Sequence, residues 1–159
     1  MAQAPVERGA RVRFPPPLVF LSAVLIGVAI DRYVAAAPIP IDRSIGMGLG
    51  VVTALCGVAL LVSSRIHFSR TGQSVIPWKP TPELIFRGPY TFTRNPMYLG
   101  MTLVVIGLGV ALNNRWIAAF AVPALLIVHV IAVLPEEAYL SEKFGDSYRA
   151  YLGRVRRYL

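Results

Sequence analysis

Residues 97–134 read MYLGMTLVVIGLGVALNNRWIAAFAVPALLIVHVIAVL, and this stretch decides the fold. It contains two apolar runs, Met97–Leu112 and Trp116–Leu134, which are separated only by the polar residues Asn-Asn-Arg at 113–115. A helix that spans a bilayer needs about 20 predominantly apolar residues, and three polar residues allow only a tight turn. We therefore predict a hairpin of two transmembrane helices, whose outer ends return to the same side of the membrane.

Two further apolar runs, Leu18–Ala37 and Ile45–Ser63, precede this hairpin. Hydrophobic residues make up 55% of the 159-residue chain and charged residues only 15%, which is too little charge for the surface of a soluble protein. A single run could instead be a buried core helix, but four runs leave no polar faces for a soluble bundle. The sequence predicts an all-α, polytopic membrane protein with four transmembrane helices.

The chain is expected to form a single domain with two halves. A short turn with prolines at 38 and 40 joins the first two helices, so residues 1–64 are predicted to form an N-terminal helical hairpin. Residues 65–159 are predicted to form the second half, which contains the candidate functional residues described below. A cleavable signal peptide is an alternative reading of the first run, because three arginines precede it and alanines 35–37 resemble a cleavage site. Prolines 15–17 and the Asp31-Arg32 pair favour a retained helix.

The formal net charge is +8, and the positions of the cations indicate topology. Thirteen of the 16 Lys and Arg residues lie before the first run, between the second and third runs, or after the fourth. Because cytosolic loops carry an excess of cations, both termini and the middle loop are predicted to be cytosolic. The basic tail is expected to face anionic headgroups. A nucleic-acid partner is not expected, because no binding motif accompanies the charge, and no obligatory protein partner is evident.

Two cytosolic segments are predicted to be ordered. The segment 65–95 is longer than a connection between neighbouring helices requires and contains Trp78 and Tyr90 among apolar residues, which favours an ordered cover. Residues 136–152 have a helical pattern with one apolar side, which predicts a cytosolic amphipathic helix after the fourth span.

Glycines 46, 48 and 50 near the start of the second helix resemble a dinucleotide-binding fingerprint. No strand precedes them, so close helix packing is the favoured role. Cys56 is the single cysteine and lies within the same helix, which excludes an internal disulfide and a cysteine metal site. Packing is its expected role, and no metal ion is expected.

Glu136 and Glu137 follow the fourth run directly, where a carboxylate is costly unless it has a partner, so they are candidates for function. Alternatively they complement the dipole of a new helix that starts at Pro135. His129 lies two helical turns before Glu136 and should point in nearly the same direction. It is either a base or ligand facing the acidic site, or a neutral ring bonded to a neighbouring helix.

Four segments together carry a family resemblance: GPY at 88–90, RNPMYLG at 94–100, EE at 136–137 and FGDSYRAY at 144–151. Their order and spacing resemble the isoprenylcysteine carboxyl methyltransferase and phospholipid methyltransferase superfamily of integral membrane enzymes. The resemblance covers about residues 65–159. It implies S-adenosyl-L-methionine as the cofactor, enclosed by the long loop and the cytosolic ends of the third and fourth helices.

The resemblance also implies which residues form the site. The cofactor-binding positions fall on Glu83, Leu84, Ile85, Tyr90, Asn95, Pro96, Met97, Tyr98 and Glu136, with Val75 as a looser candidate. The candidate catalytic residues are His129, Glu137 and Arg94. A carboxylate can pair with the methionine ammonium, and aromatic side chains can line the adenosine and the sulfonium.

Two departures bear on the acceptor. The prenylcysteine enzymes have histidine where this chain has Asn95, and an arginine that they use for substrate corresponds to Ala132. Without that cation an anionic prenylcysteine is a doubtful substrate. The expected function is therefore methyl transfer to a lipophilic or amphipathic carboxylate, amine or thiol. The alternatives are an NADPH-dependent sterol-type reductase and a non-catalytic membrane protein with a degenerate cofactor site.

Overall fold

The computed structural model describes residues 9–12, 14–70, 72, 76 and 79–158, and this part of the chain is helical, as predicted. Within it there is no strand beyond an isolated bridge between Thr93 and Arg156. The elements are α1 (Pro16–Tyr33), α2 (Arg43–Arg70), a 3₁₀ turn η1 (Gly88–Thr91), α3 (Pro96–Ala111), α4 (Arg115–Val128), a π-helical segment η2 (His129–Val133) and α5 (Leu134–Leu152).

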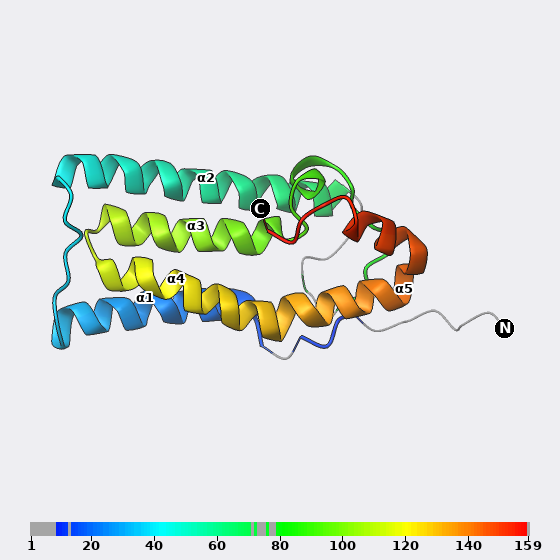
Figure 1. The fold of residues 1–159 in the computed structure, drawn as a ribbon, viewed down its shortest axis with the longest axis horizontal. Coiled ribbons are helices and arrows are strands. Elements are labelled where there is room, and N and C mark those ends of the chain that lie inside the picture. Colours follow the sequence, from blue (N-terminus) through cyan, green and yellow to red (C-terminus); the bar gives the residue numbers. More distant parts are fainter. Residues whose placement is uncertain (1–8, 13, 71, 73–75, 77–78, 159) are drawn as a thin grey trace.

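The four long helices lie side by side, with α3 between α2 and α4, and α1 alongside α4 (Figure 1). α2 packs mainly on α3, and α1 packs mainly on α4. The two helices predicted to form a hairpin in residues 1–64 therefore do not pack as a pair. Each of them packs instead on a helix of the second half, α1 on α4 and α2 on α3, so the two predicted halves are not separate in space.

Three helices are long and apolar enough to cross a membrane, namely α1, α2 and the continuous helix Arg115–Leu152. Only 17% of the most apolar window of α2 is buried inside the protein, and leucines such as Leu49 and Leu55 are more than half exposed. A helix that is apolar on its outer face is suited to lipid rather than to water. These helices make the chain a membrane protein. The fourth predicted span, α3, is shorter, with 16 residues.

Glycines allow α2 and α3 to approach closely. A Cβ atom on Gly50 would lie 2.2 Å from the backbone nitrogen of Ala111, and one on Gly107 would lie 2.5 Å from that of Ala54. Farther along the pair, Gly57 and Gly100 approach each other's backbone in the same way. Small residues permit such contact between helices in a membrane. The predicted packing role is confirmed for Gly50, whereas Gly48 faces open space.

The sequence predicted that the fourth helix ends at Leu134, but the helix continues into α5 as far as the bend at Gly145. The π-helical segment makes this possible: the N–H of Leu134 donates to the carbonyl of His129, and Pro135 follows directly. In a regular α-helix a proline ring clashes with the carbonyl four residues earlier, so a widened turn before Pro135 relieves that clash. The part of the predicted amphipathic helix before Gly145 is therefore an extension of the fourth helix, and the part after Gly145 is a separate short helical segment.

α5 bends sharply at Gly145, whose φ of 52° and ψ of −123° are not helical. Glycine reaches positive φ without a steric penalty, so the chain can turn here. After the bend, the C-terminal part of α5 turns back toward the ends of α2 and α3 (Figure 1). This return brings Tyr148 and Tyr151 to the end of the bundle where the functional site lies.

At the opposite end, which we call the closed end, the α1–α2 loop is attached to the α3–α4 turn. The backbone N–H of Arg115 donates to the carbonyl of Ala37 at 3.0 Å, and Asn113 Oδ1 accepts from the N–H of Ile39 at 2.9 Å. Asn114 caps α4 by accepting from the N–H of Ile117. Backbone groups that the two connections expose are thus satisfied by each other.

Candidate active site

A cavity of about 850 Å³, including its open mouth, lies at the other end of the bundle, which we call the site end. It is bounded by the long loop, the start of α3 and both parts of α5. Its described lining residues are Ala10, Phe68, Ile76, Thr81, Glu83, Leu84, Ile85, Tyr90, Arg94, Asn95, Pro96, Met97, Tyr98, Glu136, Tyr139, Leu140, Tyr148 and Tyr151.

All nine predicted cofactor-binding residues line this one cavity. They come from three segments, the loop at 83–90, the turn and helix start at 95–98, and Glu136 on α5. Among the three predicted catalytic residues, Arg94 lines the cavity, whereas His129 and Glu137 are not among its described lining residues. Val75 lies outside the described residues. The assigned roles stay predictions.

A short hydrogen bond joins Glu136 and Tyr98 on the cavity wall. The Tyr98 hydroxyl donates to Glu136 Oε1 at 2.5 Å, and Tyr98 is 8% exposed. In the described part of the chain no Lys, Arg or His forms an ion pair with Glu136. A carboxylate in such surroundings is costly to keep charged unless a cation is supplied. The wall of the cavity therefore presents an uncompensated acidic group.

Aromatic side chains make up much of the wall around this group. The Tyr151 hydroxyl donates to the carbonyl of Tyr90 at 2.7 Å, and the Tyr151 ring contacts Phe86 edge to face. Burial raises the pKa of Tyr90 well above its ordinary value, although a hydrogen bond with Ser64 opposes the shift. The Tyr90 hydroxyl therefore stays protonated at neutral pH and can donate a hydrogen bond, but it is not a base.

The loop over the cavity is hydrogen-bonded to α5. The backbone N–H of Thr81 donates to the Tyr139 hydroxyl at 3.0 Å, and Lys143 Nζ donates to the same oxygen at 3.2 Å. Gly88 has a positive φ, and its missing Cβ leaves space for the His67 ring of α2. The segment 79–95 is thus an ordered part of the predicted middle loop, whereas residues 65–70, which the sequence assigned to that loop, are the last residues of α2.

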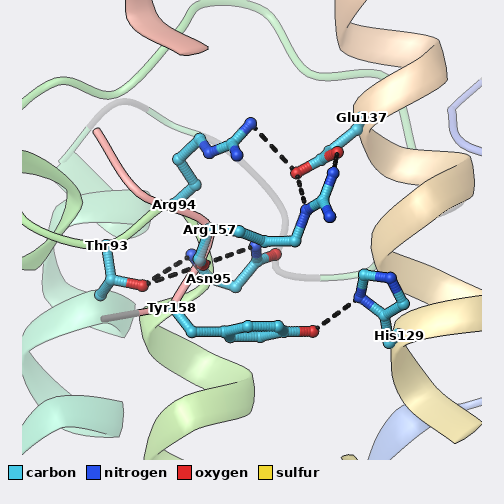
Figure 2. A network of polar contacts seen from close by, with 7 residues as sticks. All are labelled: Thr93, Arg94, Asn95, His129, Glu137, Arg157 and Tyr158. Carbon is cyan, nitrogen blue, oxygen red and sulfur yellow. Dashed lines mark hydrogen bonds and ion pairs between the residues drawn. The ribbon is translucent and has the colours of Figure 1, made fainter. Parts of the chain in front are cut away.

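Glu137 belongs to an ion-pair cluster beside the cavity (Figure 2). Arg157 donates from Nε and Nη2 to the two carboxylate oxygens at 2.9 and 2.8 Å, and Arg94 Nη1 lies 3.2 Å from Oε1. The side chains of Arg94 and Glu137 are only 13% and 14% exposed. Arg157, which the sequence predicted to face lipid headgroups with the rest of the basic tail, is therefore engaged within the protein.

His129 lies in the π-helical segment, and its Nδ1 is 3.0 Å from the Tyr158 hydroxyl (Figure 2). Burial raises the pKa of Tyr158, with Arg157 opposing the shift, so this hydroxyl also stays protonated at neutral pH. Because a π-helical turn separates His129 from Glu136, the regular spacing that predicted a shared direction does not apply between them. His129 contacts the tail rather than the described wall of the cavity.

Sequence reasoning missed the role of the tail residues and the contribution of Tyr139, Thr81 and Phe68 to the cavity. Contacts across 20 or more residues leave no local spacing signal. The tyrosines at 148 and 151 belonged to a quoted motif, and that motif pointed correctly to the site end. Ala132, the position of the missing arginine, is fully buried in the π-helical segment.

The fold and the site thus define a membrane protein with a polar, aromatic cavity at one end of a helical bundle. The family model described as phospholipid methyltransferase matches residues 45–147, which include α3, α4 and most of α2 and α5. The chain belongs to the phospholipid methyltransferase family, and this membership implies methyltransferase activity. An uncharacterized protein of Haemophilus influenzae is 35% identical over 63 residues, which are 40% of this chain and all of that protein.

Proposed function

We propose that this chain is a membrane methyltransferase that uses S-adenosylmethionine and acts on a lipophilic or amphipathic acceptor. In this proposal α3 is a fourth membrane span, and both termini and the site end face the cytosol. The excess of cations in the segments at the site end supports this orientation. Family membership favours methyl transfer over the reductase alternative.

The observation that carries the proposal is the uncompensated carboxylate of Glu136 in an aromatic cavity. S-adenosylmethionine carries a sulfonium and an ammonium, and a carboxylate can pair with either cation. Tyrosine rings stabilise a cation that lies over their faces. The donor set of the cavity therefore suits a cationic ligand with an aromatic portion.

The other parts of the cavity suit the rest of the cofactor. Arg94 lines the wall, so its guanidinium can receive the methionine carboxylate. Apolar and aromatic side chains such as Leu84, Ile85 and Tyr148 offer a surface for adenosine. The carboxylate of the cofactor thus has a cation on the wall, and its cationic portion has Glu136 and the tyrosine rings.

When bound, the cofactor supplies a methyl group on a positively charged sulfur. A lone pair of the acceptor forms the new bond to this methyl group, and the electron pair of the broken carbon–sulfur bond stays on sulfur. The residues of the chain would align the two partners and exclude water. Tyr90 can orient a ligand by donating a hydrogen bond, because its hydroxyl stays neutral. An amine or thiol acceptor must also release a proton. His129 stays the proposed base for such an acceptor.

The acceptor is proposed to enter from the bilayer. At Ala132 the chain has no cation for an acceptor carboxylate, and the buried position leaves no opening there. An anionic prenylcysteine is therefore expected to be a poor substrate compared with a neutral or amine lipid, unless another cation holds it.

The direct test is mass spectrometry of lipid and thiol extracts incubated with the purified protein and a deuterated methyl donor. A mass shift in one extract component would identify the reaction and the acceptor together. Binding of radiolabelled cofactor without any methylated product would favour the degenerate, non-catalytic alternative. Reporter fusions at Asn114 and after Tyr158 test the topology, and a cytosolic Asn114 together with an external C-terminus would contradict it.

A further inference from the structure

The residues Arg156–Tyr158, which we call the strap, lie across the turn Thr93–Asn95 that leads into α3 (Figure 2). The N–H of Arg94 donates to the carbonyl of Arg156 at 2.9 Å. The carbonyl of Arg157 accepts from Thr93 Oγ1 at 3.1 Å and from Asn95 Nδ2 at 3.0 Å. The strap is therefore bonded to the segment that carries two cavity residues, Arg94 and Asn95. It lies beyond residues 45–147, which the family model matches.

Within the cluster around Glu137, the two arginines are not equivalent. Arg157 binds both carboxylate oxygens in a bidentate arrangement, whereas Arg94 makes one longer contact of 3.2 Å with Oε1. Bidentate pairs between guanidinium and carboxylate are the stronger arrangement. Arg157 is consequently the main counterion of Glu137.

This division leaves Arg94 with unused hydrogen-bonding capacity at the cavity. A guanidinium has five N–H donors, and the Nε of Arg94 is buried without a partner in the described structure. Arg94 also lines the cavity, so the N–H donors that Glu137 does not occupy can receive an anionic group of a ligand there. Two guanidinium groups around one carboxylate also leave a surplus positive charge, which attracts an anionic group.

We propose that Arg157 is a positioning residue, which occupies Glu137 and so keeps Arg94 available for the carboxylate of the bound cofactor. The inference rests on the proposed function. Without Arg157, Glu137 would be a poorly exposed carboxylate with Arg94 as its remaining partner. Glu137 would then draw the guanidinium of Arg94 to itself, because an unpaired charge at such a position is strongly unfavourable.

A strap that serves only as structural support predicts a different outcome. Loss of Arg157 would then lower stability and weaken every ligand of the cavity alike. Competition for Arg94 instead affects only ligands that carry a carboxylate, and neutralising Glu137 removes the competitor. The two explanations can therefore be separated by the choice of ligand and by a second substitution.

The experiment is calorimetric titration of the purified, detergent-solubilised chain with S-adenosylhomocysteine and with methylthioadenosine, which lacks the amino-acid carboxylate. Arg157→Gln should weaken S-adenosylhomocysteine binding by roughly 10-fold, as expected for partial loss of a charge-assisted contact, and leave methylthioadenosine unchanged. The double variant Arg157→Gln/Glu137→Gln should recover most of the lost affinity. Arg154→Gln is the matched control, since its exposed side chain bonds only its own helix end.

Equal weakening of both ligands by Arg157→Gln would overturn the inference, as would a double variant that binds as poorly as the single one. If Arg157→Gln does not fold, Arg157→Lys keeps the charge and should give an intermediate loss for S-adenosylhomocysteine alone. Normal wild-type binding with no effect of Arg157→Gln would overturn this inference only. A wild-type chain that binds neither ligand would overturn the proposed function as well.

Discussion

The closed end of the bundle joins its helices by two short connections, whereas the site end uses residues 71–95 and the returning strap. At the closed end, backbone groups and amides bond one another, as the contacts of Asn113 and Asn114 do. Among the described residues of the site end, Glu136 has no cationic partner and the buried Nε of Arg94 has no hydrogen-bond partner. The comparison indicates that one end is built for stability, and that the other keeps unsatisfied groups for a ligand.

The largest expected effect concerns the site end. Glu136→Gln should weaken S-adenosylhomocysteine binding by roughly 10- to 150-fold, which corresponds to about 1.5–3 kcal/mol for one charge-assisted contact. The melting temperature should change little, because glutamine can still accept from Tyr98. Glu137→Gln is the control and should weaken binding little or not at all, because it removes the carboxylate that competes for Arg94. Calorimetric titration with equal affinities for wild type and Glu136→Gln would remove Glu136 from the site.

A smaller effect, on stability alone, is expected toward the closed end. Gly50→Ala places a Cβ 2.2 Å from the backbone of Ala111, so α2 and α3 must separate, at a cost of about 1–3 kcal/mol. Gly48→Ala in the same helix meets no atom within 4 Å and should be neutral or slightly stabilising. Thermal unfolding in detergent measures both. Similar melting temperatures for the two variants would contradict the close helix contact.

The smallest effect concerns the cap of α4. Asn114→Ala removes the acceptor for the N–H of Ile117 and should cost about 1 kcal/mol, whereas Asn114→Ser keeps a capping oxygen. Ligand affinity should be the same in both variants, because Asn114 lies at the closed end. If the alanine variant instead lost ligand affinity without losing stability, the two ends would be coupled and the comparison would fail.

The elements of this fold were readable from the sequence because membrane spans are set by composition over some 20 residues. The partners of the helices were not. Apolar faces do not specify which neighbour they contact, so the short loop after α1 suggested a pairing with α2 that the packing does not show. Proline 135 suggested a new helix for a similar reason, because hydropathy does not predict the π-helical turn that lets the helix continue.

For the candidate site, the motif residues gathered at one cavity because each flanks an end of a helix that returns to the same side. Two of the three predicted catalytic residues were harder to place. Glu137 and His129 looked like neighbours of Glu136 in sequence, but their contacts are with Arg157 and Tyr158. Such pairs form only when the chain bends at Gly145 and returns to the bundle. The spacing of apolar residues in the sequence does not predict that bend.

The short length of α3 has a consequence for the lipid around the protein. Its 16 residues span about 24 Å at 1.5 Å per residue, less than a hydrocarbon core of about 30 Å, whereas α2 has 28 residues. In the proposed four-span arrangement this is a hydrophobic mismatch, which a bilayer accommodates by local thinning. The start of α3 also borders the cavity. Thinning there would bring lipid headgroups down to the reacting atoms, so membrane thickness itself would control how readily an acceptor is methylated.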